Sequence, residues 1–199
     1  MFVLAGPIRF EPEPTKGSRF LADVAPIESA ADAKAIIEAV RAEFPNASHH
    51  CWAWRLGDGQ QQSSDDGEPG GSAGRPILAQ IVGHEVMDAV VVVTRWFGGT
   101  KLGVGGLVRA YGGAAGQALD RAELRRHIPM AEFLVRHAYA DDGAVETTLR
   151  EFSGTVVGAE FGAEVCRRVA LPASDAVAFR DRLRERTAGR VVAQFDVDG

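Results

Sequence analysis

The segment from residue 91 to residue 113 constrains the fold more than any other part of the chain. It reads VVVTRWFGGTKLGVGGLVRAYGG: an apolar run typical of a buried strand, a glycine-rich turn with one lysine, and the start of a helix. Eight glycines fall within residues 98–116. Because glycine is costly to order, this density indicates positive φ angles or a close approach of another group to the backbone.

The glycine-rich turn also has the ingredients of an anion site. Free N–H groups at a helix N-terminus attract phosphate, and Arg95, Lys101 and Arg109 lie close by in sequence. The P-loop pattern fails because Lys101 follows Thr100, and the dinucleotide-binding pattern fails because Val108 stands where its last glycine should be. Two interpretations remain, a tight turn with close helix packing and a phosphate-contacting surface.

Charge is distributed unevenly over the 199 residues. The net charge of −5 argues against indiscriminate binding of nucleic acid. Residues 89–128, however, hold six basic residues against two acidic ones, a local charge of +4. We therefore expect a positive patch around the glycine-rich turn of an otherwise acidic protein.

Composition favours a cytoplasmic protein. No apolar run approaches the roughly 20 residues that span a bilayer, and the first residues lack the basic flank of a signal peptide. The two cysteines, Cys51 and Cys166, are far apart and lack metal-binding spacing, which fits a reducing compartment. We expect no membrane association.

Periodicity predicts alternating strands and helices in the first part of the chain. Strands are expected over 20–27, 49–56 and 89–97, and helices over 29–44, 75–82 and 105–119. Residues 57–74, rich in Gly, Gln, Ser and Asp, are expected to form one long loop. Gly112, Gly113 and Gly116 lie inside the last helix, where we expect close packing.

A domain boundary is predicted at Ile128-Pro129, giving domains 1–128 and 129–199. After it, the pattern is strand, helix, two strands in a hairpin, a helix with Ser174 as its N-cap, and a strand from Arg190 to Val197. This βαββαβ order is ferredoxin-like. The expected fold class is α+β, in two domains.

Three carboxylates occur within four residues, at Asp65, Asp66 and Glu68. They could hold Mg²⁺, which prefers oxygen ligands. The alternative is a solvated acidic loop that caps the following helix. We expect no cofactor other than Mg²⁺, and the sequence leaves the identity of any metal open.

His49-His50-Cys51 is a weaker candidate for chemistry. Alternation along a strand lets His49 and Cys51 share a face, but no further zinc ligand has suitable spacing. A Cys–His nucleophile pair is disfavoured because no helix N-terminus is expected beside Cys51 to lower its pKa.

Several motifs together resemble the YigZ/IMPACT family, over residues 18 to about 120. The motifs are Ser18-Arg19-Phe20, His49-His50-Cys51, Ser64-Asp65-Asp66-Gly67-Glu68-Pro69 with Gly74-Arg75-Pro76, and Arg95-Trp96-Phe97-Gly98-Gly99 continuing through Leu102-Gly103 to Gly105-Gly106-Leu107-Val108-Arg109-Ala110-Tyr111. The βαββαβ tail looks like the extra C-terminal domain of the bacterial members.

The resemblance implies a fold and a setting for each half. The first half resembles a left-handed βαβ domain found in a small-subunit ribosomal protein, in elongation factor G and in GHMP kinases. The second resembles the ferredoxin-like domains of elongation factor G. The eukaryotic member, IMPACT, regulates translation through a protein partner.

Our main interpretation is a translation-associated protein that contacts RNA or the ribosome. The expected contact residues are Arg75, Arg95, Gly98, Gly99, Lys101, Gly105, Gly106 and Arg109. A protein-interaction scaffold in translation control or the stress response is the first alternative. A Mg²⁺-dependent phosphate-binding enzyme is the second, but it rests on fold analogy alone. The sequence favours a binding protein, and we assign no catalytic residue.

Overall fold

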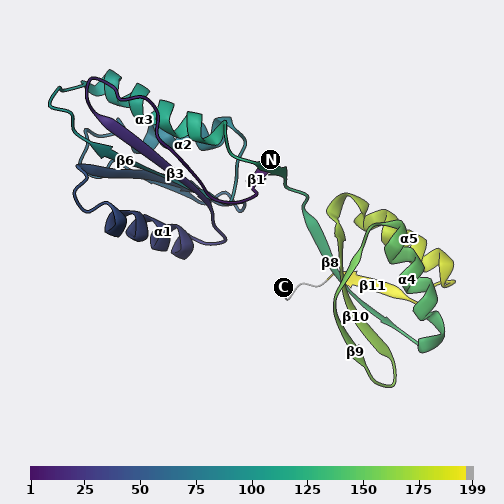
Figure 1. Cartoon of the computed structure of the whole chain (residues 1–199). Helices are drawn as coiled ribbons and strands as arrows, with labels where there is room; N and C mark the ends of the chain where they lie inside the picture. The colour runs from purple at the N-terminus through teal and green to yellow at the C-terminus, as the bar shows by residue number, and fades with distance from the viewer. Residues whose placement is uncertain (196–199) are drawn as a thin grey trace. The chain divides into compact units, whose positions relative to one another are not determined.

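The computed structural model describes residues 1–195, which fall into two compact units. The first spans Met1–His127 and the second begins at Ile128. Each unit is built around its own main sheet (Figure 1). Each also has its own apolar core. The fold class is α+β, as the sequence predicted. No helix in this part of the chain is long and apolar enough to cross a membrane.

The first unit is built on a five-stranded sheet of order β2-β3-β6-β4-β5. Its central strand, β6 (Ala89–Trp96), is antiparallel to both of its neighbours. The other strands are β2 (Ile8–Phe10), β3 (Arg19–Pro26), β4 (His49–Arg55) and β5 (Gln61–Ser64). The predicted strands at β3, β4 and β6 are confirmed.

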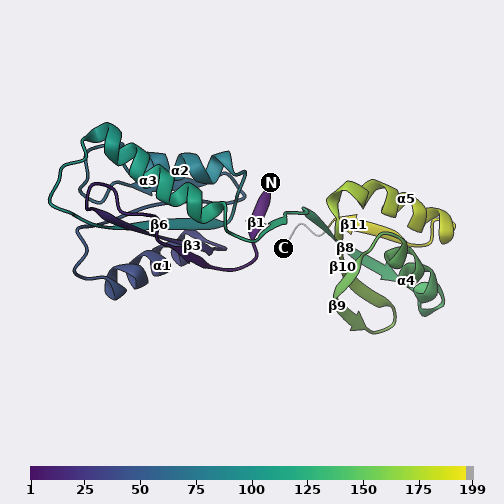
Figure 2. The ribbon, with the colours of Figure 1, turned by 45° about the horizontal axis from the view of Figure 1, so that its top comes forward.

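Helices cover both faces of this sheet (Figure 2). On one face, Val91 and Val93 of β6 pack with helices α2 (Gly74–Gly83) and α3 (Val104–Leu119). On the other face, Val90 and Val92 pack with α1 (Ala30–Glu43). This explains the continuous apolar run of β6, since a strand buried on both faces needs no alternating polar residues.

The prediction of one long loop over residues 57–74 is wrong for its first part. Residues 57–60 form a hairpin turn, and Gln61–Ser64 pairs with β4 as the edge strand β5. Polar side chains are compatible with this strand because it lies at the edge of the sheet, where Gln61 and Gln62 are exposed. Only residues 65–73 remain as a loop between β5 and α2.

Three further short strands were missed by sequence reasoning: β2, described above, and two that pair with each other. β1 (Phe2–Leu4) pairs antiparallel with β7 (Leu124–Arg126), so the start of the first unit is joined to its end. The segment just before the predicted boundary therefore contributes a strand. A three-residue strand carries too little periodicity to be recognised before its partner is known.

The second unit has the ferredoxin-like arrangement predicted from the βαββαβ order. Its sheet has the order β11-β8-β10-β9, with every pair antiparallel. The two helices pack their apolar residues against this sheet around Phe133 and Phe179. The elements are β8 (Met130–His137), η1 (Tyr139–Asp141), α4 (Asp142–Glu151), β9 (Thr155–Phe161), β10 (Val165–Pro172), η2 (Ala173–Asp175), α5 (Ala176–Arg186) and β11 (Val192–Phe195).

Two details of the second unit differ from expectation. Ser174 is not the N-cap of α5, because a 3₁₀ turn occupies Ala173–Asp175 and Ser174 Oγ instead lies 3.3 Å from Asp175 Oδ1. The last strand is observed to Phe195, and the expected end at Val197 lies outside the described residues.

The glycines of α3 serve helix packing at two of three positions. A Cβ added at Gly112 would lie 3.6 Å from Pro76, and one at Gly116 would lie 2.7 Å from the amide oxygen of Gln80, both on α2. Close packing of α2 and α3 is therefore confirmed there. At Gly113 the expectation is wrong, because nothing lies within 4 Å of the added atom.

Gly98 is required for a different reason, the crossing of two chain segments just after β6. A Cβ at Gly98 would lie 1.9 Å from the carbonyl carbon of Gly17 and 2.3 Å from the backbone nitrogen of Ser18. Backbone atoms cannot move aside as the end of a flexible side chain can. The loop before β3 and the loop after β6 therefore approach so closely that only glycine fits.

Gly98 and Gly113 form a matched pair for a stability test. We expect Gly98→Ala to lower the free energy of unfolding by about 1–3 kcal/mol, because the new methyl group overpacks against backbone. Gly113→Ala should raise it by about 0.5–1 kcal/mol, because alanine favours the helix and meets no neighbour. Urea unfolding of both variants checks this, and wild-type stability of Gly98→Ala would contradict the crossing.

Candidate functional site

A pocket of about 420 Å³ lies where β6 ends and α3 begins. Its volume is within the range of small-molecule sites, about 300–1,000 Å³. Apolar side chains form most of the wall and polar groups lie at its base. The lining residues are His49, Glu68, Pro69, Arg95, Phe97, Lys101, Leu102, Gly103, Val104 and Leu107.

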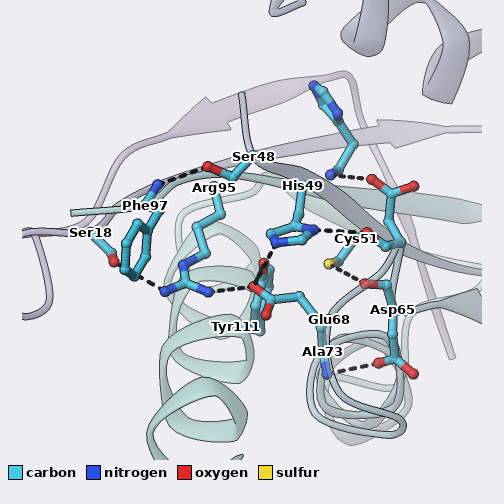
Figure 3. A network of polar contacts seen from close by, with 12 residues as sticks. Ser18, Ser48, His49, Cys51, Asp65, Glu68, Ala73, Arg95, Phe97 and Tyr111 are labelled. Atoms are coloured by element: carbon cyan, nitrogen blue, oxygen red, sulfur yellow. Dashed lines mark hydrogen bonds and ion pairs between the residues drawn. The ribbon is translucent and has the colours of Figure 1, made fainter. Parts of the chain in front are cut away.

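An ion pair between Arg95 and Glu68 forms the base of this pocket (Figure 3). The Nη1 atom of Arg95 donates to Glu68 Oε1 at 2.5 Å, and both side chains are only 5% exposed. Arg95 Nη2 also donates to Ser18 Oγ at 3.2 Å. Arg95 therefore lies beneath the pocket with its charge balanced, rather than as a free cation on the surface.

Glu68 has one oxygen in use and one free. Oε1 accepts from Arg95 and, at 2.7 Å, from the hydroxyl of Tyr111 on α3. Oε2 has no hydrogen-bond donor among residues 1–195. Because Glu68 lines the open pocket, this oxygen is available to accept a hydrogen bond from water or from a ligand.

His49 adds a second acceptor beside Glu68. Its Nδ1 lies 2.8 Å from the carbonyl oxygen of Asp66, which can only accept, so Nδ1 carries the proton in the neutral ring. Nε2 then presents a lone pair, 3.9 Å from Glu68 Oε1. Figure 3 shows the imidazole of His49 lying next to the carboxylate of Glu68.

The rim of the pocket carries the positive end of α3. The helix begins after Gly103, which has φ of 72° and provides no side-chain cap, so its first N–H groups at Val104, Gly105 and Gly106 have no acceptor in the described chain. Lys101 is exposed at the same rim. Together they make the rim electropositive, because the N-terminal end of the helix dipole and the ammonium group are both positive.

Phe97 is the large apolar side chain at this rim. It is 50% exposed, although it follows directly after the buried strand β6. Its backbone N–H donates to Ser48 Oγ at 3.0 Å, which fixes the start of the loop. One side of its ring faces the guanidinium of Arg95, at 5.6 Å from the ring centroid.

The three acidic residues point to three different partners rather than to one metal. Asp65 accepts from the N–H groups of Gly71, Ala73 and Gly74 at 2.7–2.9 Å and so caps α2. Asp66 binds Arg41 of α1 at 2.8 Å and the N–H of His50 at 2.7 Å. The helix-capping interpretation of this loop is thus the one that the geometry supports. No group of three or more His, Cys, Asp or Glu within residues 1–195 is arranged to hold a metal ion.

The expected contact residues are brought together only in part. Arg95 and Lys101 line the pocket, and Gly105 and Gly106 lie in the first turn of α3 above it. Arg109 follows one turn further on, exposed and without a carboxylate partner in the described chain. The remaining three, Arg75, Gly98 and Gly99, do not line the pocket.

Sequence reasoning missed three contributors to this site. His49 was weighed as a zinc ligand or as part of a Cys–His pair, while Tyr111 and Phe97 entered as parts of a family motif. The hydrogen bond between Tyr111 and Glu68 could not be predicted from local sequence, because it joins residues 43 positions apart. Phe97 could have been identified as the first residue beyond a doubly buried strand, where exposure begins.

Comparison with known families identifies the architecture. The Impact N-terminal domain model matches residues 16–119, and a domain of unknown function, DUF1949, matches residues 135–190. The first match covers every residue that lines the pocket. The chain belongs to the IMPACT family.

Curated relatives support this membership over most of the chain. IMPACT family member YigZ of Escherichia coli is 42% identical over 181 residues, which are 89% of each chain. An IMPACT family member of Haemophilus influenzae is 35% identical over 92% of this chain and 91% of its own. The Protein IMPACT homolog of Saccharomyces cerevisiae is 36% identical over 100 residues, 47% of this chain and 38% of its own.

A solved structure agrees with the fold. A crystal structure described as that of an hypothetical protein is 38% identical, with a TM-score of 0.72 over 100% of this chain and 98% of that one. Its agreement supports the α+β architecture of this IMPACT family chain, with a sheet in each of its two units.

The hydrogen bonds to Asp65 predict an acid-sensitive contribution to stability. Burial opposes ionisation, but the backbone donors at Gly71, Gly74 and Ala73 outweigh it, and the pKa of Asp65 lies below its ordinary value. A lowered folded-state pKa stabilises the protein above the unfolded value of about 3.9, and this contribution is lost as pH falls through the folded-state pKa.

We therefore expect Asp65→Asn to destabilise the first unit by about 1–2 kcal/mol at neutral pH, since the carboxylate is partly screened by solvent. The difference from wild type should shrink as pH falls below about 4. Urea unfolding between neutral and acidic pH measures it, with exposed Glu13→Gln as the control. A difference that is the same at every pH would contradict the capping role.

Cys51 is expected to be chemically inert in the native protein. Burial raises the pKa of its thiol to about 12, and the thiol donates to the carbonyl of Asp65 at 3.0 Å. Because the thiolate is the reactive form, a thiol reagent should modify only the half-buried Cys166 before unfolding. A Cys166→Ser variant should react only in denaturant, and rapid native labelling of that variant would contradict this.

Proposed function

We propose that this IMPACT family protein is a translation-associated binding protein that contacts RNA or the ribosome. The observation that carries the proposal is the rim of the pocket. There, an uncapped helix N-terminus, an exposed lysine and an exposed phenylalanine lie at one opening. The helix N-terminus and the lysine favour a phosphate, and the phenylalanine favours an unstacked base.

Family membership supplies the setting. The relative in Saccharomyces cerevisiae bears the name Protein IMPACT homolog and matches the domain that holds the pocket. Translation control is the activity that the IMPACT resemblance implies, and ribosomal RNA is the most abundant phosphate-rich surface in that setting. The net charge of −5 fits a local contact rather than general affinity for nucleic acid.

The geometry disfavours the enzyme alternative. The carboxylates offered for Mg²⁺ are used by α2, by Arg41 and by Arg95. The glycine-rich stretch before α2 is also filled, because the Asp65 carboxylate occupies the position that a phosphate would take at that helix N-terminus. The protein-scaffold alternative predicts a protein partner without RNA affinity, and the experiment below separates it.

The test is co-sedimentation with ribosomes and with single-stranded RNA at about 50 mM and about 200 mM salt. We expect wild type to bind with a steep loss of affinity at the higher salt concentration. Lys101→Ala/Arg109→Ala should weaken binding by about tenfold or more at low salt and reduce the slope of log K against log salt by up to about 2.

A charge-matched control keeps the result specific. Lys34→Ala/Arg125→Ala removes the same two charges from exposed positions of the same unit, on α1 and β7. We expect it to bind almost as wild type does. Equal loss in both double variants, or wild-type binding that ignores salt, would contradict the rim as a phosphate contact. Absence of any RNA or ribosome binding would favour the scaffold.

A further inference from the structure

We infer that the pocket beneath this rim takes the base of a guanosine nucleotide, with Glu68 as the residue that selects it. This inference rests on the proposed function, because it gives the proposed RNA contact a base preference. It depends on the residues at the bottom of the pocket, whereas the proposed function depends on those at the rim. The feature that carries it is a carboxylate that is 5% exposed, lines an open pocket and has one oxygen without a donor.

The polar atoms that face a ligand here accept hydrogen bonds. Glu68 Oε2 is free, and the Nε2 atom of His49 presents a lone pair. The hydroxyl of Tyr111 and the Nη1 and Nη2 atoms of Arg95 already donate to Glu68 and Ser18, while Arg95 Nε is buried and has no acceptor among residues 1–195. A ligand that satisfies Glu68 Oε2 must therefore bring N–H groups.

Among the RNA bases, guanine brings two adjacent donors on one edge, N1–H and the N2 amino group. The free oxygen of Glu68 has two lone pairs and can accept from both. Adenine and cytosine each place a ring acceptor beside their amino group, which would face the carboxylate and be repelled. Uracil offers one N–H between two carbonyl oxygens. The pattern of acceptors thus favours guanine.

The walls and rim fit the rest of such a nucleotide. Phe97 is 50% exposed and offers a stacking surface, while Leu102 and Leu107 continue the apolar wall. Lys101 and the first turn of α3 lie at the opening, where they can bind the phosphate. A ligand with an anionic group at the rim and N–H donors at the bottom of the pocket is a guanosine monophosphate unit.

That unit has two sources, a guanosine residue in single-stranded RNA and a free guanine nucleotide. The experiment measures fluorescence anisotropy of labelled uridine oligomers that carry one central guanosine, inosine or adenosine. Free GMP and AMP are tested as competitors. Inosine keeps N1–H and lacks the N2 amino group, so it removes one of the two proposed hydrogen bonds.

We expect guanosine to bind more tightly than inosine, and inosine more tightly than adenosine, with about tenfold or more between the first and the last. GMP should compete better than AMP. Equal affinity for the three oligomers would overturn the guanine site and leave the RNA-binding proposal standing. Binding of GMP but of no RNA would overturn the RNA contact and leave the guanine site standing.

Two variants test the role of Glu68 itself. Glu68→Gln presents an amide in place of the free oxygen, so the guanosine preference should disappear while affinity for the all-uridine oligomer stays. Tyr111→Phe removes the donor to Oε1 but leaves Oε2 unchanged, so it should keep the preference. A Glu68→Gln variant that retains the full preference would overturn the assignment. If that variant does not fold, the inosine comparison on wild type decides.

Discussion

The buried ion pair between Arg95 and Glu68 is the interaction on which the site depends. It joins β6 to the loop that precedes α2, and through Tyr111 and Ser18 it also fixes α3 and the start of β3. Removing one partner of a buried pair typically costs about 3–5 kcal/mol, because the other charge stays uncompensated. The charge balance needs β6 and the loop, and the remaining hydrogen bonds of the pair need α3 and the segment before β3. The pocket is therefore complete only when all four segments are in place.

The same constraint explains why three neighbouring carboxylates do not form a metal site. Once Glu68 turns inward to Arg95, Asp66 lies beside α1 and binds Arg41, while Asp65 turns to the N-terminus of α2. Each carboxylate thus neutralises a different positive group. A cation at this loop would have to compete with an arginine or with a helix dipole at every ligand.

Much of the fold followed from periodicity, and the failures share one cause. The doubly buried β6, the apolar stripe of α3 and the βαββαβ order of the second unit are local patterns with strong signals. The edge strand β5 and the ribbon of β1 and β7 were missed because a short or polar strand is stabilised by a distant partner. Local sequence carries no record of that partner.

The candidate site was predictable in its residues but not in their roles. The basic and glycine residues at the strand-to-helix turn could be named as a candidate anion contact, and two of the basic residues, Lys101 and Arg109, are exposed there. The burial of Arg95 could not, since it depends on Glu68, 27 positions earlier in the chain. The need for glycine at position 98 likewise comes from Gly17, which belongs to another strand connection.

Rigid and mobile groups are divided between the two parts of the pocket in a way that suits recognition. The carboxylate of Glu68 is held by two donors and cannot turn away, so leaving its second oxygen unsatisfied penalises a ligand that lacks N–H groups. Lys101 at the rim is exposed and free to follow a phosphate in several positions. In the proposed RNA contact, discrimination would therefore come from the buried group and affinity from the exposed one, because only a fixed acceptor can make a wrong base costly.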